Sequence, residues 1–145
     1  MDARSNIALH LVVLSSFCFL LFFAQLGKSP FFNKGEPREG LVVQNIFHQG
    51  NWLFPLRAGG EIPSKPPLFH WFGAIASAGL GGVTEFTVRF PSALFASLGI
   101  FSVYGLGRRL FNPETALWGG IILATSLGYQ HVAVSARVDM TLTFF

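Results

Sequence analysis

Three long stretches of the chain carry no charged side chain, and strongly polar segments separate them. They cover residues 7–27, 90–107 and 115–136. A helix needs roughly 20 apolar residues to cross the hydrocarbon core of a membrane, and each stretch approaches or exceeds that length. The pattern therefore predicts an all-α, polytopic transmembrane protein with three full spans. Another apolar run starts at residue 140 and is too short to cross by residue 145, so we expect residues 1–145 to be the amino-terminal part of one longer transmembrane domain.

The segment between the first two stretches, residues 28–89, has the opposite character. It holds ten of the seventeen charged residues, so we predict a polar loop with helices lying at the membrane interface. A short helix is expected from Pro37 to just before Gly50, because proline suits the first helical position and glycine ends helices. A turn or short hairpin is predicted for residues 57–61. A second, apolar helix is expected over residues 66–82; the alternative is that this segment crosses the membrane fully.

Composition supports the membrane interpretation. Hydrophobic residues make up 51% of the chain and charged residues 12%, against roughly 25% charged residues in soluble domains. The net charge is +3 and the basic residues are scattered, so no nucleic-acid partner is predicted. Residues 1–27 are expected to be a retained anchor, since the apolar run is long for a secretory signal and lacks a small-x-small cleavage pattern. The single cysteine, Cys18, excludes a disulfide within the chain.

Charge distribution also predicts the topology. Arg108 and Arg109 form the only basic doublet, in a short turn between apolar stretches, and the positive-inside tendency places that turn in the cytoplasm. The charged loop is then external, and the third span returns to the same face. Arg137 and Asp139 would thus meet Glu36 at one external site.

Several short strings in this loop and after it carry a resemblance to a known family. They are Asn-Lys-Gly-Glu-Pro-Arg-Glu at 33–39, Gly-Asn-Trp-Leu-Phe-Pro at 50–55, Ser-Lys-Pro-Pro-Leu-Phe-His-Trp at 64–71, Arg-Phe-Pro-Ser-Ala-Leu at 89–94 and Ala-Arg-Val-Asp-Met at 136–140. In this order they resemble the polyprenyl-phosphate-sugar-dependent glycosyltransferases of the GT-C superfamily, in particular the bacterial relatives of protein O-mannosyltransferases and the lipid A aminoarabinose transferase.

The resemblance implies a membrane enzyme with a GT-C-like fold in the bacterial inner membrane. Its donor would be a polyprenyl-phosphate sugar, and its acceptor a hydroxyl of a lipid, glycan or protein at the external face. Membrane lipids are the other expected partners.

Two departures from the family pattern affect the expected chemistry. The family usually has Asp-Glu where this chain has Gly35 and Glu36, although Arg38 remains. The family's Phe-Glu-Lys-Pro is Pro-Ser-Lys-Pro at residues 63–66, which removes a carboxylate that can bind a metal in relatives. No metal site is therefore predicted, and a role for a divalent metal is left open.

Five residues are assigned to the predicted site. Glu36 is the candidate general base, since partial desolvation raises the pKa of a carboxylate, and Asp139 assists or replaces it. Lys65 and Arg38, with Arg137, are the candidates for binding the donor phosphate and the charge that develops on it as it leaves. The alternatives are a helix cap for Glu36 and contacts with lipid headgroups for the cations.

The remaining polar residues suggest structural roles. His48 and His70 belong to no metal-ligand cluster, and His131 is expected to bond a neighbouring helix. A transporter or lipid flippase using the same loop without chemistry is the alternative function. A noncatalytic paralogue is a third possibility, suggested by Gly35 and Ser64.

Overall fold

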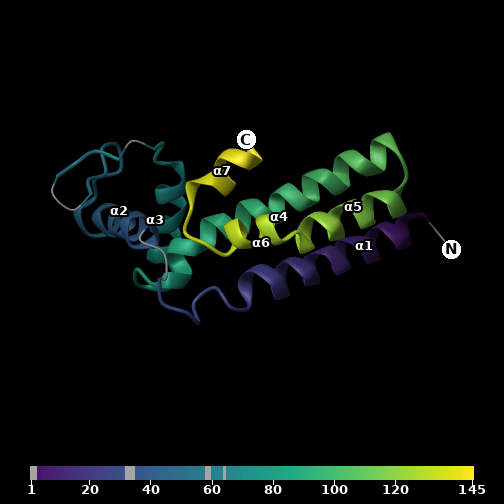
Figure 1. Ribbon diagram of the computed structural model, residues 1–145, viewed down its shortest axis with the longest axis horizontal. Helices are drawn as coiled ribbons and strands as arrows, with labels where there is room; N and C mark the ends of the chain where they lie inside the picture. The colour runs from purple at the N-terminus through teal and green to yellow at the C-terminus, as the bar shows by residue number, and fades with distance from the viewer. Residues whose placement is uncertain (1–2, 32–34, 58–59, 64) are drawn as a thin grey trace.

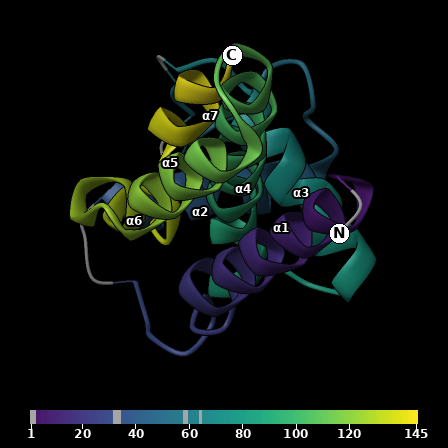
Figure 2. The same ribbon diagram turned by 90° about the vertical axis from the view of Figure 1, so that its right-hand side faces the viewer.

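The computed structural model describes residues 3–31, 35–57, 60–63 and 65–145, and all regular secondary structure in these ranges is helical. The elements are α1 (Ala3–Cys18), the π-helical turn η1 (Phe19–Phe23), α2 (Gly35–Gln49), α3 (Leu68–Leu80), α4 (Glu85–Leu110), α5 (Pro113–Thr125), α6 (Leu127–Ala133) and α7 (Val138–Phe144). Helices α1, α4 and α5 lie side by side along the long axis (Figures 1 and 2). Helices α2 and α3 gather at one end of this bundle.

Two of the described helical segments are long and apolar enough to cross a membrane. They are Asn6–Phe23, which joins α1 to η1, and the 26-residue α4. Helix α4 begins before the predicted start at residue 90, because Thr84 caps it. The Thr84 hydroxyl accepts a bond from Thr87 N at 3.2 Å and the Thr87 hydroxyl accepts one from Thr84 N at 2.9 Å.

The third predicted span is not one continuous helix. Helix α5 has 13 residues, or about 20 Å at 1.5 Å per residue, and stops where Ser126 adopts an extended backbone. The Thr125 hydroxyl donates to the carbonyl of Ile121 at 2.9 Å, a local bond that competes with helix continuation. Helix α6 then packs on α4, where the Tyr129 hydroxyl donates to Ala96 O at 2.7 Å.

Both helices predicted in the polar loop are present. Helix α2 is followed by Gly50 at φ 69°, and α3 by Gly81 at φ 80°, a left-handed conformation that glycine adopts without strain. At the ends of the turn predicted over residues 57–61, Arg57 N donates to Glu61 O at 2.8 Å; residues 58 and 59 of this turn lie outside the described residues. The position of these helices relative to the membrane surface stays a prediction.

A small second core attaches the loop helices to the bundle. Its buried side chains are Val42, Val43 and Ile46 from α2, Phe69 and Ala74 from α3, Val88 from α4, and Ala136 and Val138 from the α6–α7 region. Helices α2 and α3 approach closely at Gly73, where an added Cβ would come within 2.9 Å of the Val43 side chain. This core places the polar loop beside the residues that precede α7.

Candidate functional site

The first acidic residue of the loop lies inside the protein. Glu36, on the first turn of α2, is 4% exposed. Both of its oxygens accept bonds from Arg89: Nε lies 2.9 Å from Oε1 and Nη2 lies 3.0 Å from Oε2. Glu36 Oε1 also accepts a bond from Ala136 N at 2.9 Å. The carboxylate therefore joins α2, α4 and the segment before α7, and this two-point geometry is the strongest that arginine forms with a carboxylate.

Arg89 has no donor left for another ligand. Beyond its two bonds to Glu36, its Nη1 donates to Leu26 O at 2.9 Å and Ser29 O at 2.7 Å, and its Nη2 donates to Pro30 O at 3.1 Å. A guanidinium has five N–H donors, and these bonds use all of them. Arg89 thus holds the chain that follows η1 against α4 and is no candidate for binding phosphate.

These contacts bear on the predicted base. A general base must have an oxygen within reach of the substrate proton, and the Glu36 oxygens already accept from Arg89 and Ala136. The geometry gives Glu36 a clear structural role, while its assignment as the base stays a prediction.

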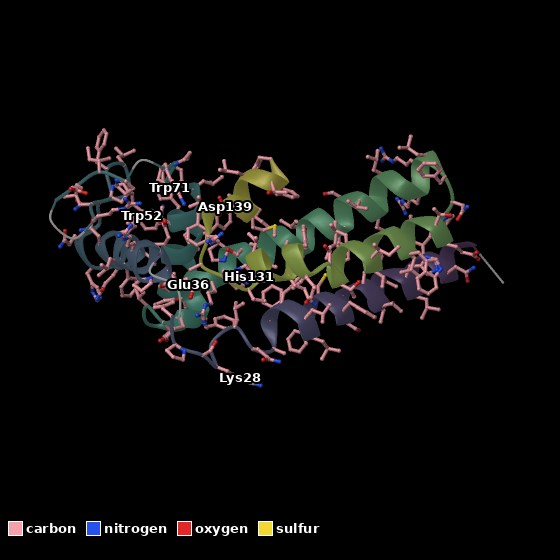
Figure 3. All side chains as sticks on the ribbon, in the orientation of Figure 1. Lys28, Glu36, Trp52, Trp71, His131 and Asp139 are labelled. Atoms are coloured by element: carbon pink, nitrogen blue, oxygen red, sulfur yellow. The ribbon has the colours of Figure 1, made fainter. Side chains whose placement is uncertain are left out.

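Asp139, unlike the buried Glu36, is open to solvent. Its side chain is 53% exposed, on the first turn of α7, and lies 3.9 Å from the equally open Arg137. The segment is fixed to α4 because the Ser92 hydroxyl donates to Arg137 O at 3.0 Å. Since Glu36 binds the backbone of Ala136, the two predicted acids do come from neighbouring segments (Figure 3).

A second buried carboxylate, Glu39, was missed by the sequence analysis as a site residue. It is 5% exposed, and its Oε2 accepts a bond from His70 Nε2 at 2.6 Å. Its Oε1 lies 3.7 Å from Lys65 Nζ and 4.0 Å from Arg57 Nη2. A signal was available in the sequence: Glu39 lies four residues before Val43 and so shares its inward helical face.

The charges around Glu39 set its protonation. Burial raises the pKa of this carboxyl, but the His70 hydrogen bond and the charges of His70, Lys65 and Arg57 outweigh burial, so the pKa falls below its usual 4.5. Glu39 is therefore ionised at neutral pH.

This depressed pKa predicts how stability depends on pH. The pairing of Glu39 with His70, Lys65 and Arg57 stabilises the fold above pH 4.5 and is lost as the pH falls through the lower pKa of the folded state. A Glu39→Gln variant of the full-length protein should melt below the wild type at pH 7, and the gap should narrow below pH 4.5. Thermal unfolding in detergent at several pH values measures this. A gap that stays constant down to pH 3 would contradict the pairing.

The predicted phosphate-binding cations lie in two places. Lys65 contacts Glu39 just before α3, and the exposed Arg38 lines a cavity of about 320 Å³ together with Leu41, Arg57 and Glu61. Arg137 lies on the α6–α7 segment and contacts Asp139.

The remaining predictions have mixed outcomes. Gly35 is exposed, and an added Cβ would meet no atom of the described residues within 4 Å. Ser64 lies outside the described residues. His131 is exposed and its side chain makes no hydrogen bond to the described residues, so its predicted bond to a neighbouring helix is wrong; only its carbonyl accepts, from Ser135 Oγ at 2.6 Å. In the described ranges no group of three His, Cys, Asp or Glu side chains could hold a metal.

The fold matches a solved structure. The crystal structure of ArnT from Cupriavidus metallidurans bound to undecaprenyl phosphate superposes with a TM-score of 0.83 at 24% identity, over 92% of this chain and 25% of that one. This likeness shows an all-helical fold shared with that structure, and two of the described helical segments are long and apolar enough to cross a membrane.

The sequence identifies the family. The chain belongs to the dolichyl-phosphate-mannose-protein mannosyltransferase family, whose model matches residues 64–145, more than half of the chain. The resemblance carried by the loop motifs is thereby confirmed.

Curated relatives narrow the comparison. The undecaprenyl phosphate-alpha-4-amino-4-deoxy-L-arabinose arabinosyl transferase of Pseudomonas savastanoi pv. phaseolicola is 27% identical over 110 residues, covering 76% of this chain and 20% of its own length. Transferase 2 of the same description from Pseudomonas fluorescens (strain Pf0-1) is 30% identical over 127 residues, covering 87% of this chain and 23% of its own. The chain thus spans about a fifth to a quarter of the length of these relatives.

Proposed function

We propose that the protein carrying this chain transfers a glycosyl group from a polyprenyl-phosphate-linked sugar to an acceptor hydroxyl. The observation that carries the proposal is the match of residues 64–145 to a family of lipid-phosphate-sugar transferases. The relatives are glycosyltransferases, which favours transfer chemistry over a transporter or flippase. The acceptor is a lipid, a glycan or a protein.

The residues divide into two roles in this reaction. Asp139 accepts the proton of the attacking hydroxyl, because its carboxylate is open to solvent on a fixed segment. Lys65 and Arg38, with Arg137 beside Asp139, stabilise the negative charge of the departing lipid phosphate. Glu36 keeps the two segments of the site together through Arg89 and Ala136; its direct use as the base is the alternative.

The proposed reaction takes place at the external face of the bacterial inner membrane. The basic pair Arg108 and Arg109 lies exposed at the end of α4, which is the end of the bundle opposite to α2 and α3 (Figure 1). The positive-inside tendency assigns that end to the cytoplasm and the polar loop to the periplasmic side, in a multi-pass protein.

Lysine substitution tests the proposal. The full-length protein is incubated with labelled polyprenyl phosphate sugar, and release of the lipid phosphate is followed. Lys65→Ala should lower kcat/KM about 100-fold, as expected when a group that stabilises leaving-group charge is removed. Lys28→Ala, which removes an exposed lysine from the segment after η1 (Figure 3), should transfer at the wild-type rate. An inactive wild type, or equal turnover in Lys65→Ala, would reject the proposal.

A further inference from the structure

The cations around Glu39 outnumber it. One buried carboxylate faces Arg57 and Lys65, each of which carries a full positive charge, and it also bonds His70. Even without counting His70, the cluster has a surplus positive charge. The distances of 4.0 Å and 3.7 Å from Arg57 and Lys65 exceed those of direct hydrogen bonds, so Glu39 attracts both cations without occupying their donors.

Arg57 is held in place by its backbone. Its neighbour Leu56 donates its N–H to Asn45 Oδ1 on α2 at 3.1 Å, and Arg57 N donates to Glu61 O at 2.8 Å. The same segment is fixed to α3, because Trp71 Nε1 donates to Trp52 O at 2.7 Å (Figure 3). The backbone that carries Arg57 is fixed in this way, so binding a ligand has to order only the side chain.

Arg57 also has unused bonding capacity. Its Nε is buried and has no hydrogen-bond partner among the described residues, and burying such a donor unpaired costs free energy. Arg57 borders the cavity of about 320 Å³ that Arg38 and Glu61 also line, and its Nη2 lies 4.0 Å from Glu39 Oε1. Arg57 thus connects Arg38 and Lys65, the two loop cations predicted to bind phosphate: it lines a cavity with Arg38, and it shares the contact with Glu39 Oε1 with Lys65.

We infer that Arg57 is a further anion-binding residue, which takes a phosphate group between Lys65 and Arg38, and that Glu39 is the positioning residue for Arg57 and Lys65. The inference rests on the proposed function for the source of the phosphate, the head of a polyprenyl phosphate. The planar guanidinium of Arg57 binds two phosphate oxygens at once. The Glu39 carboxylate orients Arg57 and Lys65, and because it is negatively charged it repels a phosphate that comes too close to it.

The test measures binding of undecaprenyl phosphate to the full-length protein in detergent. Arg57→Gln should weaken the affinity about tenfold or more, as expected for one charge-assisted hydrogen-bonded pair. Arg57→Lys should fall between this variant and the wild type, because it keeps the charge and loses the two-point geometry. Glu39→Gln alone should weaken binding of undecaprenyl phosphate. When it is combined with Arg57→Gln it should weaken binding much less, because Glu39 acts through Arg57. Arg108→Gln, an exposed arginine at the far end of α4, is the matched control and should bind normally.

The same binding measurements with phosphatidylglycerol and with inorganic phosphate show which kind of molecule supplies the bound phosphate group. A loss confined to undecaprenyl phosphate supports the donor lipid, and an equal loss for inorganic phosphate supports recognition of the phosphate group alone. Wild-type affinity in Arg57→Gln, with an unchanged melting temperature, would overturn the inference. If that variant weakens binding but the wild type releases no lipid phosphate, the proposed transfer fails while the binding site stands.

Discussion

Replacing Asp139 with Asn is expected to lower transfer by the full-length protein about 10²- to 10⁴-fold, the usual contribution of a positioned general base. The amide keeps the size of the side chain and removes its capacity to accept the hydroxyl proton. Stability should change little, because the carboxylate is 53% exposed and its contact with Arg137 is a solvent-screened pair at 3.9 Å. Release of lipid phosphate and thermal unfolding, measured on the same sample, separate the two effects.

The matched control is Glu114→Gln. It makes the same chemical change at an exposed carboxylate on the first turn of α5, at the opposite end of the bundle. This variant should retain full transfer. Normal turnover in Asp139→Asn would rule out Asp139 as the base and would return that role to Glu36, for which Glu36→Gln is then the decisive variant.

The second large effect concerns stability. Arg89→Leu should destabilise the folded protein by about 3–5 kcal/mol, the usual cost of leaving a buried charge without its partner. Glu36 would lose both of its guanidinium bonds, and the carbonyls of Leu26, Ser29 and Pro30 would lose their donor. Thermal unfolding of the full-length protein in detergent, together with the yield of monodisperse protein, measures the loss.

Two further variants show whether the loss of stability in Arg89→Leu comes from the unpaired charge of Glu36. Arg109→Leu removes an exposed arginine from the last turn of the same helix and should leave the melting temperature within the range of neutral surface changes. Glu36→Leu combined with Arg89→Leu should be more stable than Arg89→Leu alone, because the double variant buries no lone carboxylate. An Arg89→Leu protein that melts like the wild type would show that the ion pair contributes nothing.

Local pattern predicted most of the helices. The proline at 37 and the glycine at 50 are signals that depend on neighbouring residues: α2 ends before Gly50 as predicted, but it begins at Gly35, two residues before the predicted start. The break at Ser126 was not predicted, because a count of uncharged residues is insensitive to a hydroxyl that bonds its own helix.

The site was predicted less completely because its partners are distant in sequence. The charge-based topology brought the loop and the segment before α7 together, which the bond between Ala136 N and Glu36 confirms. The choice of partners depends on tertiary packing: Arg89 takes Glu36, and His70 takes Glu39. No local motif distinguishes these two acids, which lie one turn apart on α2 and are both buried.

The bonds of Arg89 also set an order for assembly during synthesis. The carbonyls of Leu26, Ser29 and Pro30 are translated about 60 residues before the arginine that binds them. Ala136, whose N–H binds Glu36, is translated 47 residues after Arg89 and 100 residues after Glu36 itself. The polar loop therefore leaves the ribosome well before it can close, and its final shape is reached only after the helices on both sides of the Arg108–Arg109 turn have been made.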